Sequence, residues 1–214
     1  MTKLLISLPL SDRAQKYYGS NASTYNKVGD AGIDLPFIGD WQPYDVEVTE
    51  TIGLISFGTI FAMYTISSQE AFDYFYLTDN KSTEIIQYFL NKGDLLSSHF
   101  DIRPRSSIGK SPFRLANSVG TIDKTYCGIE SSTIPSSFLN CMGDTLGAYL
   151  DYHPQLGTKP RKSSIAAGER LLQIVAPSLD DIVHVRLDFT EENCVFWSET
   201  ISSKKRDGFG SSGR

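Results

Sequence analysis

The chain has 214 residues, of which 40% are hydrophobic and 21% are charged, and its formal net charge is −5. This composition is typical of a soluble globular protein with one sizeable core. The negative net charge argues against non-specific binding of nucleic acid, which requires a basic face that neutralises phosphates. It does not exclude a small anionic ligand, which needs only a few cations in one place.

The cysteines Cys127, Cys141 and Cys194 have no CxxC spacing. Their odd number predicts neither a disulfide framework nor a zinc site, and it favours a reducing compartment. The N-terminal segment has no long apolar region followed by a small-residue cleavage site, so it does not resemble a signal peptide. We therefore expect a cytoplasmic protein, or one in the cytoplasm or nucleus of a host cell if the chain is viral.

The first elements are predicted from apolar runs and turn residues. Residues 3–8 are apolar and end at Pro9, which predicts a strand, whereas the polar residues 17–30 predict a loop. Alternation over residues 44–66 predicts further strands. Residues 51–69 carry no charge, but Gly, Ser and Thr interrupt them. They are therefore interpreted as one or two buried strands and not as a membrane span.

Residues 67–95 are predicted to form a partly helical insertion. Ser67 and Glu70 have the spacing of a capping box, and Gly93 is a typical helix end. Between them, four apolar residues recur at helical spacing: Ile85, Ile86, Phe89 and Leu90. The segment FDYFYL alternates, so that a strand at that point remains an alternative.

The second half of the chain alternates between strand and turn patterns. Residues 99–130 predict short strands, and residues 131–167, rich in Ser, Pro and Gly, predict a long loop or a second insertion. Strand patterns resume at residues 171–175 and 183–189. The Gly/Ser-rich, cationic residues 202–214 predict a mobile arm that follows a domain of residues 1–201. Many short strands with frequent turns indicate an all-β sandwich or jelly roll.

Five segments place unusual residues at turns, and each alone is a weak signal. They are DAGIDL at residues 30–35, RPRSS at 103–107, NSVGTIDKTYCG at 117–128, GERLLQIV at 168–175 and RDGFGSSG at 206–213. Singly, they could be a surface turn, a solvated turn aspartate or a disordered tail.

Together the five segments resemble the motifs of the trimeric dUTPase family, the deoxyuridine triphosphate nucleotidohydrolases. The family patterns are roughly AGxDL, PRSS, an Asn–Gly-x-Ile-Asp-x-x-Tyr hairpin, G(D/E)R-x-x-Q and a C-terminal Gly-Phe-Gly-Ser-x-Gly. All five occur in family order, which chance matches would rarely keep. The resemblance implies a distorted jelly-roll or β-clip fold and the hydrolysis of dUTP to dUMP and pyrophosphate.

The resemblance makes Asp123 the general base that activates the attacking water. It also implies that the third segment is a β-hairpin whose backbone pairs with uracil in a slot too narrow for the 5-methyl group of thymine. In this segment the residues expected to bind substrate are Asn117, Gly120, Ile122 and Tyr126. Tyr126 resembles the family tyrosine that packs under the deoxyribose and leaves no space for a 2′-hydroxyl.

The remaining segments are expected to hold the triphosphate. Arg105, Ser106 and Ser107 supply a charged fork and short donors, and Gln173 adds a neutral donor near the α-phosphate. Asp34 is expected to contact Mg²⁺ through water, because magnesium keeps several waters and is bound mainly by phosphates.

The C-terminal arm is expected to close over the site as a lid. Phe209 would stack on uracil, and the other predicted contacts of the arm are Arg206, Gly210, Ser211 and Ser212. In the resembling family this arm comes from another subunit, which implies a homotrimer with sites at its interfaces.

This chain departs from the family pattern at several points. Lys204 occupies the place expected for an arginine, unless Arg206 takes that role, and Asp207 would be repulsive near phosphate. Cys127 follows Tyr126 where the family usually has arginine. The stretches between the motifs are long, and such embellished versions are associated with large-genome viruses and some unusual microbes.

Three other readings remain open. A dCTP deaminase-like enzyme also carries Pro-Arg-Ser-Ser, but it requires neither Asp123 in a hairpin nor the Phe209 lid. A non-catalytic module that binds dUTP differs from the enzyme in its lack of turnover. A structural virion or surface domain predicts decay of the motifs, which the sequence does not show.

Overall fold

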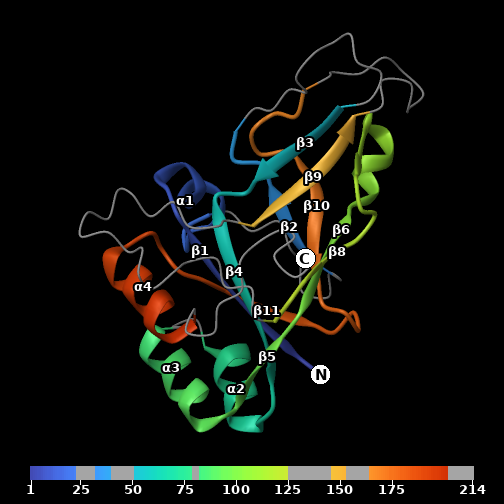
Figure 1. The fold of residues 1–214 in the computed structure, drawn as a ribbon. Coiled ribbons are helices and arrows are strands. Elements are labelled where there is room, and N and C mark those ends of the chain that lie inside the picture. Colours follow the sequence, from blue (N-terminus) through green and yellow to red (C-terminus); the bar gives the residue numbers. More distant parts are fainter. Residues whose placement is uncertain (23–31, 40–50, 79–81, 125–145, 153–163, 202–214) are drawn as a thin grey trace, which may run out of the picture.

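The computed structural model describes residues 1–22, 32–39, 51–78, 82–124, 146–152 and 164–201. Strands in these residues form three sheets, with helices packed beside them (Figure 1). The structure is therefore rich in β-strands, as predicted. Among the described helices, none combines the length and the hydropathy that a membrane crossing requires.

The first sheet has the order β11-β1-β4-β5. Its strands are β1 (Lys3–Pro9), β4 (Thr59–Ile66), β5 (Leu95–Ser98) and β11 (Ile182–Arg186). Strands β1 and β11 run parallel, and the other pairs are antiparallel.

The second and third sheets have the orders β2-β10-β6-β8 and β3-β9-β7, with antiparallel pairs throughout. The second comprises β2 (Ile33–Pro36), β10 (Arg170–Val175), β6 (Phe100–Pro104) and β8 (Gly120–Ile122). The third comprises β3 (Thr51–Ser56), β9 (Gly147–Tyr152) and β7 (Phe113–Leu115).

The first sheet is covered on both faces, which explains why every residue of β1 is buried. Leu4, Ile6 and Leu8 point into one cluster, which includes residues of the helices α2 (Gln69–Leu77), α3 (Thr83–Lys92) and α4 (Glu191–Phe196). Leu5 points into a second cluster. Alternation along a strand sends successive side chains to opposite faces, so one apolar strand serves both cores.

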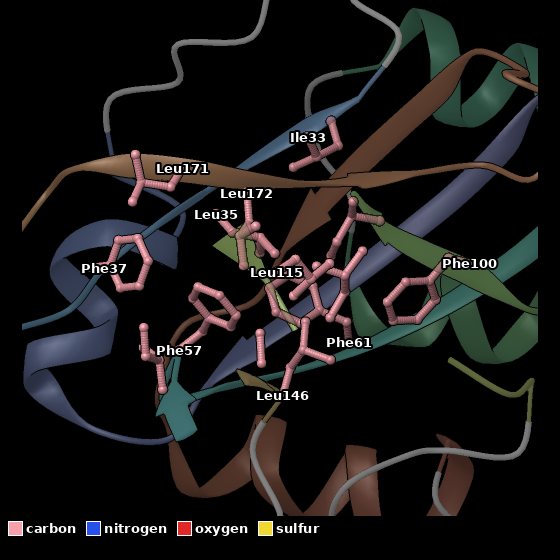
Figure 2. Packing of buried hydrophobic residues seen from close by; sticks show 14 of the residues in the cluster. Ile33, Leu35, Phe37, Phe57, Phe61, Phe100, Leu115, Leu146, Leu171 and Leu172 are labelled. Atoms are coloured by element: carbon pink, nitrogen blue, oxygen red, sulfur yellow. The ribbon is translucent and has the colours of Figure 1, made fainter. Parts of the chain in front are cut away.

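The second core joins the three sheets and positions the strands that carry the candidate site. Figure 2 shows Leu35 of β2, Phe61 of β4 and Phe100 of β6 pointing into this cluster. These three side chains are at most 1% exposed. Burial of this kind stabilises the folded state by about 25 cal/mol per Å² of apolar surface. It therefore stabilises the positions of β2 and β6.

The predicted strand at residues 3–8 is confirmed by β1, and those at residues 171–175 and 183–189 largely by β10 and β11. The uncharged stretch 51–69 contains the two strands β3 and β4, as predicted. The prediction of a long loop over residues 131–167 is wrong at residues 147–152, which form β9, because this strand pairs with both β3 and β7.

The helices make the all-β prediction too narrow. Residues 67–95 are partly helical as predicted, with Gly93 in the left-handed conformation after α3. FDYFYL lies in α2 and not in a strand. The cap of α2 is Ser68 instead of Ser67, since the Ser68 hydroxyl accepts from the amide of Ala71 at 3.2 Å. Ser67 donates instead to the carbonyl of Asp94, at 3.1 Å.

Two more helices lie outside the predicted insertion. Helix α1 (Asp12–Tyr18) includes the first two residues of the predicted loop 17–30, and α4 continues into the π-helical turn η4 (Trp197–Ile201). Ser11 and Thr190 cap α1 and α4 with their hydroxyl groups, at 3.1 Å and 3.2 Å from the bonded amide nitrogens. Residues 23–31, 40–50, 79–81, 125–145, 153–163 and 202–214, with the predictions made for them, lie outside the described residues.

Asp188 joins α1 to the segment before α4. Its carboxylate accepts hydrogen bonds from the Ser20 amide at 2.9 Å, from the Ser20 hydroxyl at 2.7 Å and from the side chain of Gln15. Burial opposes ionisation, but the bonds from Ser20 and Gln15 outweigh it and lower the pKa of Asp188. A lowered pKa means that the folded state favours the ionised carboxylate.

We expect Asp188→Asn to lower the free energy of unfolding by about 1 kcal/mol at pH 7, a value discounted for partial solvent screening. The wild-type advantage is complete above the unfolded aspartate pKa of about 3.9, and it is lost as the pH falls through the lower folded pKa. Urea unfolding at pH 7 and pH 3 measures this difference. Asp181→Asn is the control, and an equal loss for both variants at pH 7 would contradict the assignment.

Candidate functional site

Three of the five segments meet at Asp34, in the middle of β2. Its Oδ1 lies 2.7 Å from Nε of Arg105, and its Oδ2 lies 3.0 Å from Nη1 of Arg170. The Asp34 side chain is 11% exposed, while those of Arg105 and Arg170 are 30% and 29% exposed. This arginine cluster of Asp34, Arg105 and Arg170 has two positive charges and one negative charge, so its net charge of +1 favours an anion.

The backbone fixes the arginine cluster at the end of β10. Arg105 follows β6, and its amide donates to the carbonyl of Leu171 at 2.8 Å. The carbonyl of Arg170 accepts from Nη1 of Arg105 at 3.2 Å and from the Ser107 hydroxyl at 2.9 Å. The β2–β10 register shifts between Arg170 and Leu172, and such a bulge redirects the side chains beside it. Ser106, in contrast, is exposed.

Gln173 lies beside Asp34 on the second sheet. The pairing register places Asp34, Gln173 and Arg103 in one row across β2, β10 and β6. Leu172 and Ile174 are fully buried on the other face, so Gln173 points with Asp34 away from the core. A Cβ atom on Gly32 would lie 2.8 Å from the carbonyl oxygen of Ile174 and 3.0 Å from the Gln173 side-chain oxygen, so only glycine fits here.

The third segment begins with a turn and β8. Ser118 has a positive φ of 61°, and the Val119 amide donates to the carbonyl of Asn117 at 2.6 Å. The side chain of Asn117 lies over Gly120, since a Cβ there would be 3.6 Å from its Nδ2 atom. Ile122 pairs with Phe100, and Asp123 follows the strand as an exposed residue. The second strand of the predicted hairpin lies outside the described residues.

A buried carboxylate that sequence reasoning missed holds β8 on β6. Asp101 is 7% exposed. Its Oδ1 accepts from the Thr121 hydroxyl at 2.9 Å, and its Oδ2 accepts from Nη2 of Arg103 at 2.8 Å. Arg103 lies two residues from Asp101 on the same strand, but Thr121 lies on another strand, so the bond from Thr121 depends on the pairing of β6 with β8. It anchors the strand that precedes Asp123.

The structure does not bring Asp123 to the arginine cluster within one chain. Ile122 lies opposite Phe100, at the start of β6, whereas Arg105 lies beyond the other end of that strand. Five residues of extended chain separate Phe100 from Arg105, which corresponds to about 17 Å. This separation is too large for both groups to contact the same phosphate.

A pocket of about 740 Å³ opens between the 3₁₀ helix η1 (Ser106–Lys110) and residues 164–171. We call it the η1 pocket. Arg105, Ser107 and Arg170 line it, but Gln173 and Asp123 do not. Phe113 and Leu171 add apolar surface, so this pocket offers a cationic side and an apolar side to a ligand.

Asp34 is the residue predicted to contact Mg²⁺ through water. In that part of the chain no group of three or more His, Cys, Asp or Glu side chains could hold an ion. Both Asp34 oxygens contact guanidinium groups, so a direct metal bond does not fit. The contact of Asp34 with Mg²⁺ through a metal-bound water stays a prediction.

The described residues therefore contain part of the predicted site. Tyr126, Arg206, Phe209, Gly210, Ser211 and Ser212 lie outside them, as do Cys127, Lys204 and Asp207. Sequence reasoning missed Arg170, although it lies within the fourth segment. A cation next to a predicted phosphate-binding strand end is a signal that could have identified it.

The sequence matches no protein-family model and no curated protein. Among solved structures, the chain is similar to a mutant dUTPase of Staphylococcus bacteriophage 80alpha with dUpNHpp. The sequence identity is 16%, 98% of each chain is covered, and the TM-score is 0.41.

Proposed function

We propose that the chain hydrolyses dUTP to dUMP and pyrophosphate. The observation that carries this proposal is the arginine cluster, in which Asp34, Arg105 and Arg170 come from three segments far apart in the sequence. Segments that resemble one family's motifs singly could be accidental. Their convergence on one cationic site supports a common role.

The arginine cluster would bind and orient the triphosphate. Arg105 and Arg170 supply planar donors that match phosphate oxygens, and Asp34 fixes the direction of both guanidinium groups. Exposed Ser106 adds a short hydroxyl donor, and Gln173 adds a neutral one near the α-phosphate. The Ser107 hydroxyl donates to the carbonyl of Arg170, so Ser107 would contribute its backbone amide. Fixed donors of this kind lower the barrier most when they match the charge that develops in the transition state.

Asp123 would act as the general base for the attacking water. Water attacks the α-phosphorus, its proton passes to the carboxylate, and the bond from the α-phosphorus to the bridging oxygen breaks to release pyrophosphate. Asp123 follows Ile122, which pairs with Phe100 about 17 Å along β6 from Arg105, so we propose that Asp123 serves a site on a neighbouring copy. A homotrimer with sites at its interfaces satisfies this requirement.

Selection of the base would come from the third segment. Asn117 and the backbone of Gly120 and Ile122 would line a narrow slot that pairs with uracil, and Tyr126 would exclude a 2′-hydroxyl. A site whose buried groups pair with one base leaves those groups unsatisfied when another base enters. UTP and dTTP are therefore expected to be poor substrates.

We propose Mg²⁺ as the cofactor, held mainly by the triphosphate and reached from the protein through a water that donates to Asp34. When bound, the ion offsets negative charge on the phosphates. The C-terminal arm would close the site, with Phe209 on uracil and Arg206, Gly210, Ser211 and Ser212 near the phosphates.

Pyrophosphate release from dUTP, dCTP, dTTP and UTP, with and without Mg²⁺, tests the proposal. We expect rapid release from dUTP with Mg²⁺, and rates lower by at least about 100-fold for the other three nucleotides. Ammonia release from dCTP would identify a deaminase instead. Binding of dUTP without turnover would identify a binding module.

A further inference from the structure

Lys110 is an exposed cation that lines the η1 pocket. It is the last residue of η1. Within the described part of the chain its ammonium group takes part in no ion pair or hydrogen bond. The guanidinium groups of Arg105 and Arg170, by comparison, share the carboxylate of Asp34.

Glu169, the acidic residue that lines the pocket, forms a hydrogen bond within its own turn. Glu169 is exposed, and its Oε2 accepts from the amide of Ala166 at 3.1 Å. It lies in the segment opposite η1, where this bond closes a turn before β10. The pocket is lined by the cations Arg105, Lys110 and Arg170 and by the acid Glu169. Both arginines pair with Asp34, whereas Lys110 adds a positive charge that this carboxylate does not offset.

The geometry of η1 directs Lys110 to the same side as Ser107. Residues three apart in a 3₁₀ helix lie on one face. The hydroxyl of Ser107 contacts the carbonyl of Arg170, so this face points toward the arginine cluster. Ser111 fixes the end of the helix, because its hydroxyl donates to the carbonyl of Ile108 at 2.8 Å and accepts from the amide of Phe113 at 3.2 Å.

We propose that the η1 pocket binds the two terminal phosphates of the nucleotide, and that Lys110 makes binding depend on the length of the phosphate chain. This inference rests on the proposed function, since it concerns the same substrate. A triphosphate extends from the arginine cluster into the pocket and meets Lys110, whereas a monophosphate ends at the cluster. Lys110 is thus a specificity-determining residue that lies outside the five segments.

The test compares Lys110→Gln with Lys110→Arg and a control, Lys92→Gln, which removes the same charge from α3. Binding of inorganic tripolyphosphate, pyrophosphate and phosphate is measured by calorimetry at low ionic strength, where charge effects are largest. The KM for dUTP and the inhibition constant of dUMP are measured on the same proteins. Melting of the unliganded variants confirms that each one is folded.

We expect Lys110→Gln to weaken tripolyphosphate binding and raise the KM for dUTP by about five- to twentyfold, with kcat and dUMP inhibition nearly unchanged. Lys110→Arg and Lys92→Gln should resemble the wild type. Equal tripolyphosphate binding by wild type and Lys110→Gln, or no binding by either, would overturn the inference. Because calorimetry needs no turnover, a wild type that binds tripolyphosphate through Lys110 but leaves dUTP intact would refute the proposed function alone.

Discussion

Asp123→Asn should lower kcat for dUTP by about 10²- to 10⁴-fold, because the amide cannot accept the proton of the attacking water. Binding of dUpNHpp should change little, since the side chain keeps its size and Asp123 is exposed. Steady-state hydrolysis and calorimetry measure the two effects separately. Turnover at the wild-type rate would show that another group is the base.

Mixing variants tests whether the site is shared between copies. Asp123→Asn and Arg105→Gln should each be inactive alone, because each lacks one part of every site. After the two proteins are unfolded and refolded together, mixed assemblies should contain some complete sites and recover part of the activity. Mixtures as inactive as the single variants would contradict the subunit-shared site.

Asp34→Asn should lower kcat/KM for dUTP by about 100-fold. The change removes the charge that holds Arg105 and Arg170, and two guanidinium groups without it repel each other. Loss of one partner of a buried pair costs about 3–5 kcal/mol. The arginines here are partly exposed, so we expect Asp34→Asn to lower the free energy of unfolding by about 2 kcal/mol. Urea denaturation measures this loss.

Calorimetry with dUpNHpp in EDTA separates the two roles of Asp34. Weaker binding without metal is expected, since the arginines are then no longer oriented. If binding in EDTA were unchanged and only the Mg²⁺ requirement rose, Asp34 would act through the metal alone. Asp151→Asn serves as the control, because Asp151 pairs with Arg114 at 3.3 Å on the third sheet.

Local sequence patterns predicted those helices and strands whose signals lie within a few neighbouring residues. The apolar run of β1 and the helical spacing and Gly93 of α3 are signals within a few residues. The short helices α1 and α4 were missed, since six or seven residues give little periodicity and their stability comes from packing. Strand β9 was missed for a similar reason, because its pairing with β3 and β7 is long-range.

In the candidate site, too, local signals predicted some residues, and long-range contacts determine the rest. Asp34, Arg105 and Gln173 were predicted from their segments, and the structure places all three at the adjacent strands β2, β6 and β10. The pairing of Asp34 with two arginines was not predictable, because it depends on a bulge that shifts the register beside Arg170. The network of Asp101 depends likewise on which strands lie side by side.

Hydrolysis of dUTP in water labelled with oxygen-18 tests the central claim most directly. Attack of an Asp123-activated water on the α-phosphorus places the label in dUMP and leaves pyrophosphate unlabelled. Mass spectrometry of both products after one turnover distinguishes them. Label in dUMP alone is the predicted result, whereas label in pyrophosphate, or no cleavage of dUTP, would contradict the account.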